Sequence, residues 1–423
     1  MLKPSVTTPQ SELYEINQGW GYTLTGSNNN FVTKKPLNPY LFLQTVQTNK
    51  SMFSKKDVAK ADEARLLQQR LGFPGTSALE SYLRKNFLSN TSITVDDVQR
   101  GSVIYGPLPQ LLKGKFTDNK QLYVPAPNPT PVHPLIMDQC HNLSLFVDYF
   151  YVNGLCFLLT HTEKLGFLTA TFCERTGGAE AIRAFEHVLE IHSRLGFTIT
   201  NVHGDNEFHS KKLHQGLPDL LFSACAAEEH VPQAERPIRT IKERSRCITH
   251  DVPFAIFPKL LTKELILFVI ERLNDFPSKG TLSESESPNM HVLGHPRPDI
   301  SLPFVSFGSY CLVYMGTDNT QKARAVPAIA LRPSNLSGAF YFMSLYSGKR
   351  LHAYRWKELP IDQDVIDRVH ELGTRDAQPP NVHSELLFEW QPGLPLDEDQ
   401  GAASDVFELH NTNPHPVPEV LLP

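Results

Sequence analysis

The sequence FTITNVHGDNEF at positions 197–208 is followed, after an interval, by PQAERPIRTIKERSR at positions 232–246. The first segment predicts a strand of apolar and β-branched residues that ends in an acidic cluster. The second predicts a basic helix that opens with another carboxylate, Glu235. Upstream, the apolar run LSLFVDYF at positions 143–150 carries one acid, Asp148, in its interior. The pattern predicts carboxylates on separate elements of an α/β unit.

Asp148, Asp205 and Glu235 suggest a divalent-metal site for phosphoryl-transfer chemistry. Two divalent ions about 4 Å apart can activate a nucleophile and stabilise the leaving oxygen of a phosphodiester. Mg²⁺ and Mn²⁺ prefer oxygen ligands, so we expect these carboxylates to converge at one end of the sheet. Asp205 stands where a strand ends, and ligand-contacting residues gather there in α/β sheets.

Each of these acids also has a simpler interpretation. A buried, unpaired carboxylate is costly, so Asp148 needs a metal, a partner or a solvent opening, unless it faces outward on an edge strand. These two alternatives carry equal weight. Asp205 follows Gly204 and could be a turn aspartate, the commoner case for a single Gly-Asp pair. Glu235 would lie in the first turn of a helix, where capping alone favours an acid.

Further polar residues surround the same stretch, and spacing excludes none of the carboxylates among them. The competing carboxylates are Glu207, Glu228 and Glu229. His203 and His230 flank the candidate site, and we interpret both as hydrogen-bonded structural residues.

Basic residues follow Glu235 along the predicted helix. Arg239, Lys242 and Arg246 recur at i+4, i+7 and i+11, and Arg236 is adjacent. Such a stripe could follow a phosphate backbone. A solvated surface face is the more common role of a charged helix, and remains the alternative.

The composition indicates an intracellular protein of two or three domains, in the nucleus or cytoplasm. The chain has 423 residues and 33 prolines, which imply long irregular connections. No run approaches the roughly 20 apolar residues of a membrane span, and no secretory signal is visible. Six scattered cysteines without a CxxC pair predict reduced thiols, with no disulfide framework or zinc site. The formal net charge is -5, but 13 acidic and two basic residues lie after position 360, so the rest of the chain is basic.

The chain divides into six predicted segments. Residues 136–300 contain three strands, the first two joined by the hairpin signal Asn153-Gly154, and then alternating helix and strand. This order suits an α/β ribonuclease-H-like core. The other segments are an irregular leader (1–50), a helical domain (51–115), a Pro-rich linker (116–135), a small all-β, barrel-like module (301–360) and an acidic Pro-rich tail (361–423). We expect the tail to be largely disordered from about Gln378, although LLFEWQPG within it is apolar enough to dock.

At these residues the chain resembles the integrase region of copia-type long-terminal-repeat retrotransposons, particularly divergent copia-like elements of microbial eukaryotes. HGDNEF at 203–208 is similar to the family's Asp-Asn-Gly-x-Glu-Phe stretch with residues deleted. PQAER at 232–236, followed by Arg239-Thr240, is similar to its third-carboxylate helix without the usual Asn-Gly. Asp148 takes the place of the first catalytic aspartate.

The resemblance runs from about Thr45 to Pro360 and implies metal-dependent 3′-end processing and strand transfer into target DNA. Asp148, Asp205 and Glu235 would then hold two Mg²⁺ or Mn²⁺ ions. The implied partners are double-stranded DNA, both element ends and target, and further copies of the chain in a homo-oligomer. The alternative is a degenerate, non-catalytic remnant that binds DNA or protein.

The chain departs from the family in its helical segment. Gln68 and Phe73 replace both histidines of the His-x-Arg-Leu-Gly-His motif, and residues 95–100 contain no cysteine. We therefore expect no zinc in this segment. No aspartic protease or reverse transcriptase motif is present, so the chain is a polyprotein fragment or a stand-alone derivative. The β-rich segment 301–360 would offer DNA a basic surface made of Lys322, Arg324, Arg332, Lys349, Arg350, Arg355 and Lys357.

Overall fold

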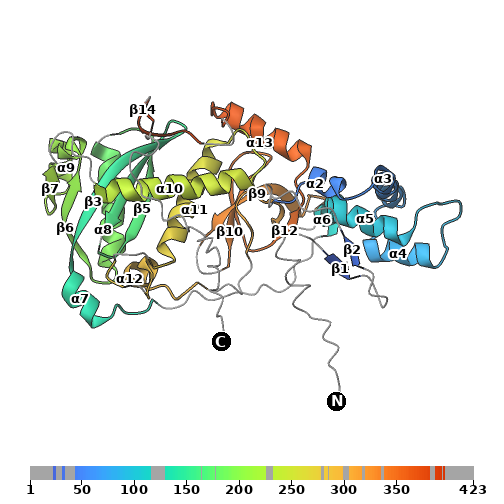
Figure 1. Cartoon of the computed structure of the whole chain (residues 1–423), viewed down its shortest axis with the longest axis horizontal. Coiled ribbons are helices and arrows are strands. Elements are labelled where there is room, and N and C mark those ends of the chain that lie inside the picture. Colours follow the sequence, from blue (N-terminus) through green and yellow to red (C-terminus); the bar gives the residue numbers. More distant parts are fainter. Residues whose placement is uncertain are drawn as a thin grey trace, which may run out of the picture.

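A computed structural model of the chain shows a mixed α/β architecture drawn out along one axis (Figure 1). The structure describes residues 22–24, 31–33, 43–115, 129–162, 164–176, 178–224, 232–277, 281–283, 285–298, 304–316, 320–334, 338–381, 386–392 and 394–395. Within them, no helix is long and apolar enough to cross a membrane.

A mixed sheet carries the segments singled out above. Its strands are β3 (Asn142–Val152), β4 (Leu155–Thr162), β5 (Phe167–Cys173), β6 (Thr198–Gly204) and β7 (Leu221–Ala224). β3, β4 and β5 form an antiparallel meander, while β6 runs parallel to β3 and β7 parallel to β6. The predicted hairpin is confirmed, because Asn153 and Gly154 have φ values of 49° and 73°.

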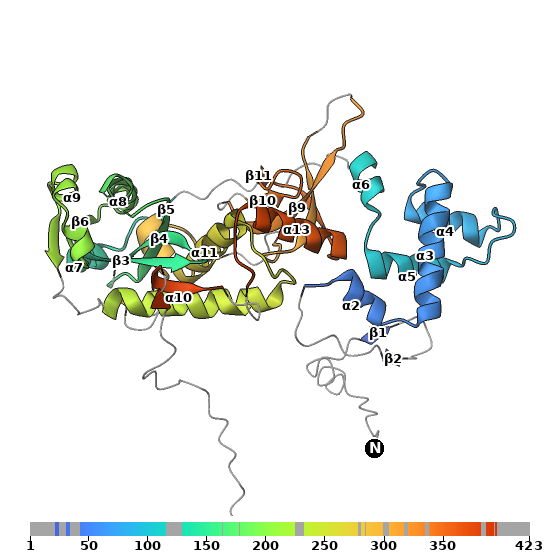
Figure 2. The same cartoon turned by 90° about the horizontal axis from the view of Figure 1, so that it is seen from above.

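Helices cover both faces of this sheet. Helix α8 (Gly178–Ser193) packs on one face, and α10 (Pro232–Asp251) and α11 (Lys259–Asn274) pack on the other (Figure 2). Along β3, Leu145 and Val147 belong to the α8 side, whereas Phe150 and Val152 belong to the side of α10 and α11. Successive side chains of a strand alternate in direction, so Asp148 points to the α10 side.

Short elements connect these layers. They are α7 (Pro134–Cys140), the 3₁₀ helix η2 (Asn206–His209), α9 (Lys211–Gly216) and α12 (Pro288–Leu293).

The N-terminal part is helical. It contains α2 (Val46–Ser51), α3 (Lys55–Arg70), α4 (Thr76–Arg84), α5 (Val95–Tyr105) and α6 (Pro109–Lys115), with the short strands β1 (Tyr22–Leu24) and β2 (Phe31–Thr33) before them. Ala64, Leu79 and Val98 form its small core. Gln68, at a position where the resembled family has a histidine, is buried, and its Nε2 donates to the Pro74 carbonyl at 2.8 Å. Gln68 therefore holds the turn that follows α3.

Five antiparallel strands follow the mixed sheet along the chain. They are β8 (Tyr310–Tyr314), β9 (Ala325–Pro333), β10 (Phe340–Ser344), β11 (Arg350–Ala353) and β12 (Trp356–Leu359), in the spatial order β11-β10-β9-β8-β12. Leu312, Ile329 and Met343 share one hydrophobic cluster with residues of α11. This sheet is therefore built onto the α/β unit through a common core.

Two of the basic residues expected to face DNA form ion pairs with carboxylates of α11, and one of them, Arg350, stays exposed. Arg332 forms ion pairs with Glu264 and Glu271 of α11, each at 2.5 Å, and Arg350 pairs with Glu264 at 3.0 Å. These ion pairs reduce the basic charge that the predicted surface would offer to DNA. They could not be predicted, because the α11 carboxylates are distant in sequence.

The described C-terminal part contains a helix and two short strands. Helix α13 (Gln363–Arg375) buries Val365, Val369 and Leu372, so an apolar stripe at helical spacing underlies its acidic surface. Strand β13 (Phe388–Gln391) pairs with β3 and with β14 (Leu394–Pro395), so the LLFEWQPG stretch docks on the mixed sheet.

Candidate functional site

Asp148 and Asp205 occupy neighbouring parallel strands. The register of β3 and β6 pairs Phe146 with His203, whose rings stack with centroids 4.9 Å apart. Asp148 and Asp205 each follow two residues later, so continuing this register sets them side by side. His203 serves here as a stacking partner for Phe146.

Gly204 allows the close approach of the two strands. A Cβ atom at this position would lie 2.6 Å from Val147 Cγ2 and 2.8 Å from Phe208 Cδ2. No real side chain fits those distances without movement of the backbone or the neighbours. The Asp205 side chain makes no cap hydrogen bond to the 3₁₀ helix that it precedes. Its carboxylate therefore does not do what a turn aspartate usually does.

Glu235 comes to the same face of the sheet through α10. The buried residues Ala234 and Ile238 seat the first turns of this helix. The ring Nδ1 of His161 in β4 lies 2.8 Å from the carbonyl oxygen of Gln233, which ties the start of α10 to the strand beside Asp148. Our sequence analysis did not identify His161. The sequence feature that could have pointed to His161 is its polar ring at the end of the otherwise apolar run LCFLLTH.

The carboxylates act on one another electrostatically. Burial raises the pKa of Asp148 to about 8, and the negative charges of Asp205, Glu235 and Glu207 raise it as well. One contact works in the opposite direction, because the Tyr149 amide donates to Asp148 Oδ1 at 2.7 Å. Asp148 thus stands in a negative field to which both other predicted acids contribute.

Within the described residues, β3 is not an edge strand, although Asp148 itself has a paired partner only in β4. β3 pairs with β4 on one side and with β6 and β13 on the other. Of the competing carboxylates, the exposed Glu207 also acts on Asp148. Glu228, Glu229 and His230 lie outside the described residues.

Comparison with known proteins gave similar solved structures but no match to a family model and no match among curated proteins. The similar structures are retroviral integrase catalytic cores. One is the core of BIV integrase, 13% identical with a TM-score of 0.28, covering 36% of this chain and 93% of that one. Another is the HTLV-2 integrase core in complex with magnesium in a trimeric form, 16% identical with a TM-score of 0.29, covering 36% and 97%. The dimeric form of the same HTLV-2 core is 16% identical with a TM-score of 0.28, and the match covers 37% of this chain and 98% of that one.

The donor chemistry suits a hard divalent cation, but the described side chains are not gathered around one point. Carboxylate oxygens are the ligands that Mg²⁺ and Mn²⁺ prefer. The raised pKa of Asp148 comes first from burial and then from neighbouring negative charge, and a cation would offset both. Within the described parts of the chain, however, no group of three or more His, Cys, Asp or Glu side chains is placed to hold a metal ion. The charges of Asp205 and Glu235 act on Asp148, but the described side chains do not form a set of metal ligands.

The basic residues of α10 lead away from Glu235. Ile238 and Ile241 turn toward the core, whereas Arg236 and Arg239 are exposed. Further along the helix, Lys242 and Arg246 are half-buried. At about 1.5 Å of rise per residue, the four side chains extend over roughly 15 Å of helix. The helix therefore carries an acid at its start and a net positive charge beyond it, although Glu243 is also exposed on it.

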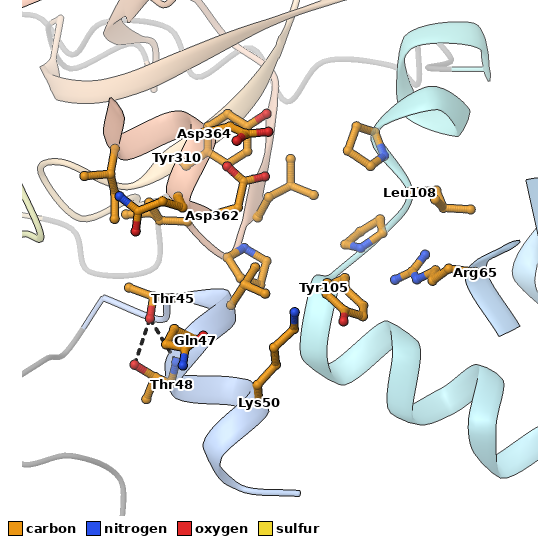
Figure 3. A pocket seen from close by; sticks show the side chains of 18 of the residues that line it. Thr45, Gln47, Thr48, Lys50, Arg65, Tyr105, Leu108, Tyr310, Asp362 and Asp364 are labelled. Atoms are coloured by element: carbon orange, nitrogen blue, oxygen red, sulfur yellow. Dashed lines mark hydrogen bonds between the residues drawn. The ribbon is translucent and has the colours of Figure 1, made fainter. Parts of the chain in front are cut away.

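A separate cavity of about 1110 Å³ lies between the N-terminal helices and the start of α13 (Figure 3). On one side, Lys50 and Arg65 approach the Tyr105 ring, with their charged groups 5.2 and 5.8 Å from its centroid. Asp362 and Asp364 line the opposite side. None of the three predicted site residues lines this cavity.

Proposed function

We propose that this protein is an integrase-like polynucleotidyl transferase that processes the 3′ ends of element DNA and joins them to target DNA with a divalent metal. The proposal is supported by the half-buried Asp148 on β3, by the β3–β6 register that continues to Asp205, and by Glu235 on the basic helix that packs on the same face of the sheet.

In this proposal, Asp148, Asp205 and Glu235 hold two Mg²⁺ or Mn²⁺ ions. The ions would supply activation of a water or 3′-hydroxyl nucleophile and stabilisation of the leaving oxygen. The contribution of the chain is to position the acids: β3 and β6 fix Asp148 and Asp205 side by side, and the His161 contact fixes the start of α10.

DNA would lie along the outer side of α10. Arg236, Arg239, Lys242 and Arg246 would neutralise backbone phosphates, which gives affinity without sequence preference. The predicted homo-oligomer, and a place for the protein in the nucleus or cytoplasm, also belong to this proposal.

One observation favours the alternative of a non-catalytic DNA- or protein-binding remnant. The described acids do not form a three-ligand metal site. The absent histidines at positions 68 and 73 point the same way. In that case the basic helix would bind DNA and the carboxylates would have no catalytic use.

The test is a joining assay with purified protein, a labelled short duplex and a plasmid target, in Mg²⁺ or Mn²⁺. Asp148→Asn, Asp205→Asn and Glu235→Gln should each abolish product. Matched controls are Glu243→Gln, an exposed acid on the same helix, and Asp138→Asn, an exposed acid of α7; both should retain activity. If the wild type binds DNA without joining it, and the three variants bind equally well, the remnant hypothesis replaces this proposal.

A further inference from the structure

One edge of β3 is shared by two strands that come from opposite parts of the chain. β6 pairs with this edge from Asn142 to Phe146, and β13 pairs with it at Tyr151 and Val152. In the described register, Asp148 lies between these two paired stretches. The sheet therefore divides beside Asp148, with the end of β6 on one side and the C-terminal strand on the other.

The C-terminal strand is firmly docked at this position. The Asn153 amide donates to the Leu387 carbonyl at 2.8 Å, and the Leu387 amide donates to Asn153 Oδ1 at 2.8 Å. Asn153 Nδ2 donates to Asn381 Oδ1 at 3.2 Å. The rings of Phe388 and Phe150 lie nearly parallel, at 5°, with centroids 6.4 Å apart.

Trp390 shares a face of the sheet with Asp148. Phe388 and Trp390 both pack with the cluster that contains Phe150, on the α10 side. Since β13 is antiparallel to β3 and pairs Phe388 with Val152, continuing the register sets Trp390 opposite Phe150. Asp148 is the next residue of β3 on that face, a diagonal neighbour at about 7–8 Å between backbone positions.

We propose that Trp390 stacks on an unpaired base at the end of a DNA substrate and thereby places that end beside Asp148. Trp390 is half-buried and packs at the edge of the core cluster, beside the division in the sheet, and every base offers a π-face to an indole ring. Positive charge on α10 would hold the neighbouring phosphates. This inference rests on the proposed function for the identity of the substrate, and it assigns the C-terminal segment to the DNA-binding site.

The test compares two labelled duplexes of one sequence, one flush and one with unpaired nucleotides at its end. Binding is measured in EDTA, so that no joining occurs. Trp390→Ala should weaken binding of the unpaired end about tenfold and leave the flush duplex unchanged, because one base stack is lost. Trp390→Phe keeps an aromatic face and should retain most of the wild-type affinity for the duplex with the unpaired end. The control is Leu387→Ala, an exposed apolar residue of the same segment.

Two outcomes would overturn the inference while leaving the proposed function intact. If Trp390→Ala distinguishes the two duplexes as well as the wild type does, the ring does not contact the unpaired base. If it weakens both duplexes equally and lowers the urea midpoint of unfolding, Trp390 is a packing residue only. Failure of the wild type to bind either duplex would instead reject the proposed function itself.

Discussion

Gly204 and Val147 touch so closely that a Cβ atom on the glycine would lie 2.6 Å from Val147 Cγ2. These residues immediately precede Asp205 and Asp148. The close packing of Gly204 on the Val147 side chain, one residue before each acid, therefore helps to set the spacing of the two acids. Any side chain at position 204 has to separate the strands or displace Phe208.

We expect Gly204→Ala to destabilise the protein by about 1–3 kcal/mol, the usual cost of overpacking a core, and to reduce joining activity further than the loss of folded protein explains. Urea unfolding and the joining assay measure the two effects. Gly114→Ala is the control, because a Cβ there meets no atom within 4 Å. Full activity in Gly204→Ala would show that the acids do not depend on this contact.

The raised pKa of Asp148 predicts an unusual dependence of stability on pH. The folded protein keeps a proton on Asp148 up to about pH 8, whereas the unfolded chain releases it near the ordinary aspartate pKa of about 3.9. The contribution of Asp148 to the free energy of unfolding is therefore fully present below pH 4. It is lost as the pH rises to about 8. The Asn side chain does not ionise, so the Asp148→Asn variant does not lose this stability at high pH. We expect the variant to be more stable than the wild type at pH 9.

The gain from Asp148→Asn should approach about 1.4 kcal/mol for each unit of the pKa shift, and it should shrink toward pH 4. Urea unfolding at several pH values checks this, with Asp138→Asn, at an exposed position, as the control. A pH-independent difference between wild type and Asp148→Asn would contradict the shift. Adding Mg²⁺ at pH 9 should stabilise the wild type more than the variant, because a cation that binds the folded state favours it.

The mixed sheet was accessible from sequence because its signals are local. Alternating and apolar runs located β3, β4 and β6, and Asn153-Gly154 fixed the hairpin. The same runs placed Asp148 inside a strand and Asp205 at a strand end. Whether these acids act on one another depended on the strand register, which local pattern does not give.

Other features depend on contacts between distant segments and could not be predicted. β13 lies in a stretch that composition marks as acidic and proline-rich, and its partner strand is far upstream. Arg332 and Arg350 look available for DNA until the carboxylates of α11 are placed beside them. In both cases the residue types indicated what kind of contact the segment could make. The sequence pattern did not show which distant segment would be its partner.

The basic side of α10 should control the salt dependence of DNA binding. Each phosphate contact removed should lower the slope of log K against log salt by about 0.9. We expect Arg239→Ala and Arg246→Ala each to show this change and to weaken binding of all sequences alike. Arg194→Ala is the control, since Arg194 follows α8 on the other face of the sheet and pairs with Glu190. An unchanged slope in both variants would move the DNA path away from α10.

The ion pair of Arg332 and Glu264 should matter far more than surface pairs. Glu264 is 2% exposed, so Arg332→Met leaves a carboxylate buried with one fewer partner and should cost about 3 kcal/mol. Replacing both residues by apolar ones, Arg332→Met with Glu264→Leu, should recover only part of the loss, because Glu271 still lacks Arg332. Urea unfolding gives these values. Arg194→Met, at an exposed pair, should cost at most about 1 kcal/mol, and an equal cost at both sites would contradict the buried network.

Asn153 combines a turn conformation with three hydrogen bonds to the C-terminal segment, and substitutions separate the two roles. Asn153→Gly keeps the positive φ but loses the side-chain bonds to Leu387 and Asn381. Asn153→Asp keeps an acceptor for the Leu387 amide. Asn153→Ala loses the side-chain bonds and adds left-handed strain of about 1–2 kcal/mol. At this buried position the Asp carboxylate lacks a counter-charge among the described residues and faces Asn381 Oδ1, so we expect Asn153→Asp to lose stability as well. Asn153→Gly should be more stable than Asn153→Ala.

Limited proteolysis of the C-terminal segment checks whether the loss arises from docking. Cleavage near β13 should accelerate in Asn153→Gly and Asn153→Ala, because the strand leaves β3 when its anchor is removed. Asn90→Ala is the matched control for backbone strain, since Asn90 is exposed and has a φ of 58°. It should lose stability without exposing β13. Equal protection of β13 in wild type and Asn153→Gly would mean that the Phe388 and Phe150 rings hold the strand without Asn153.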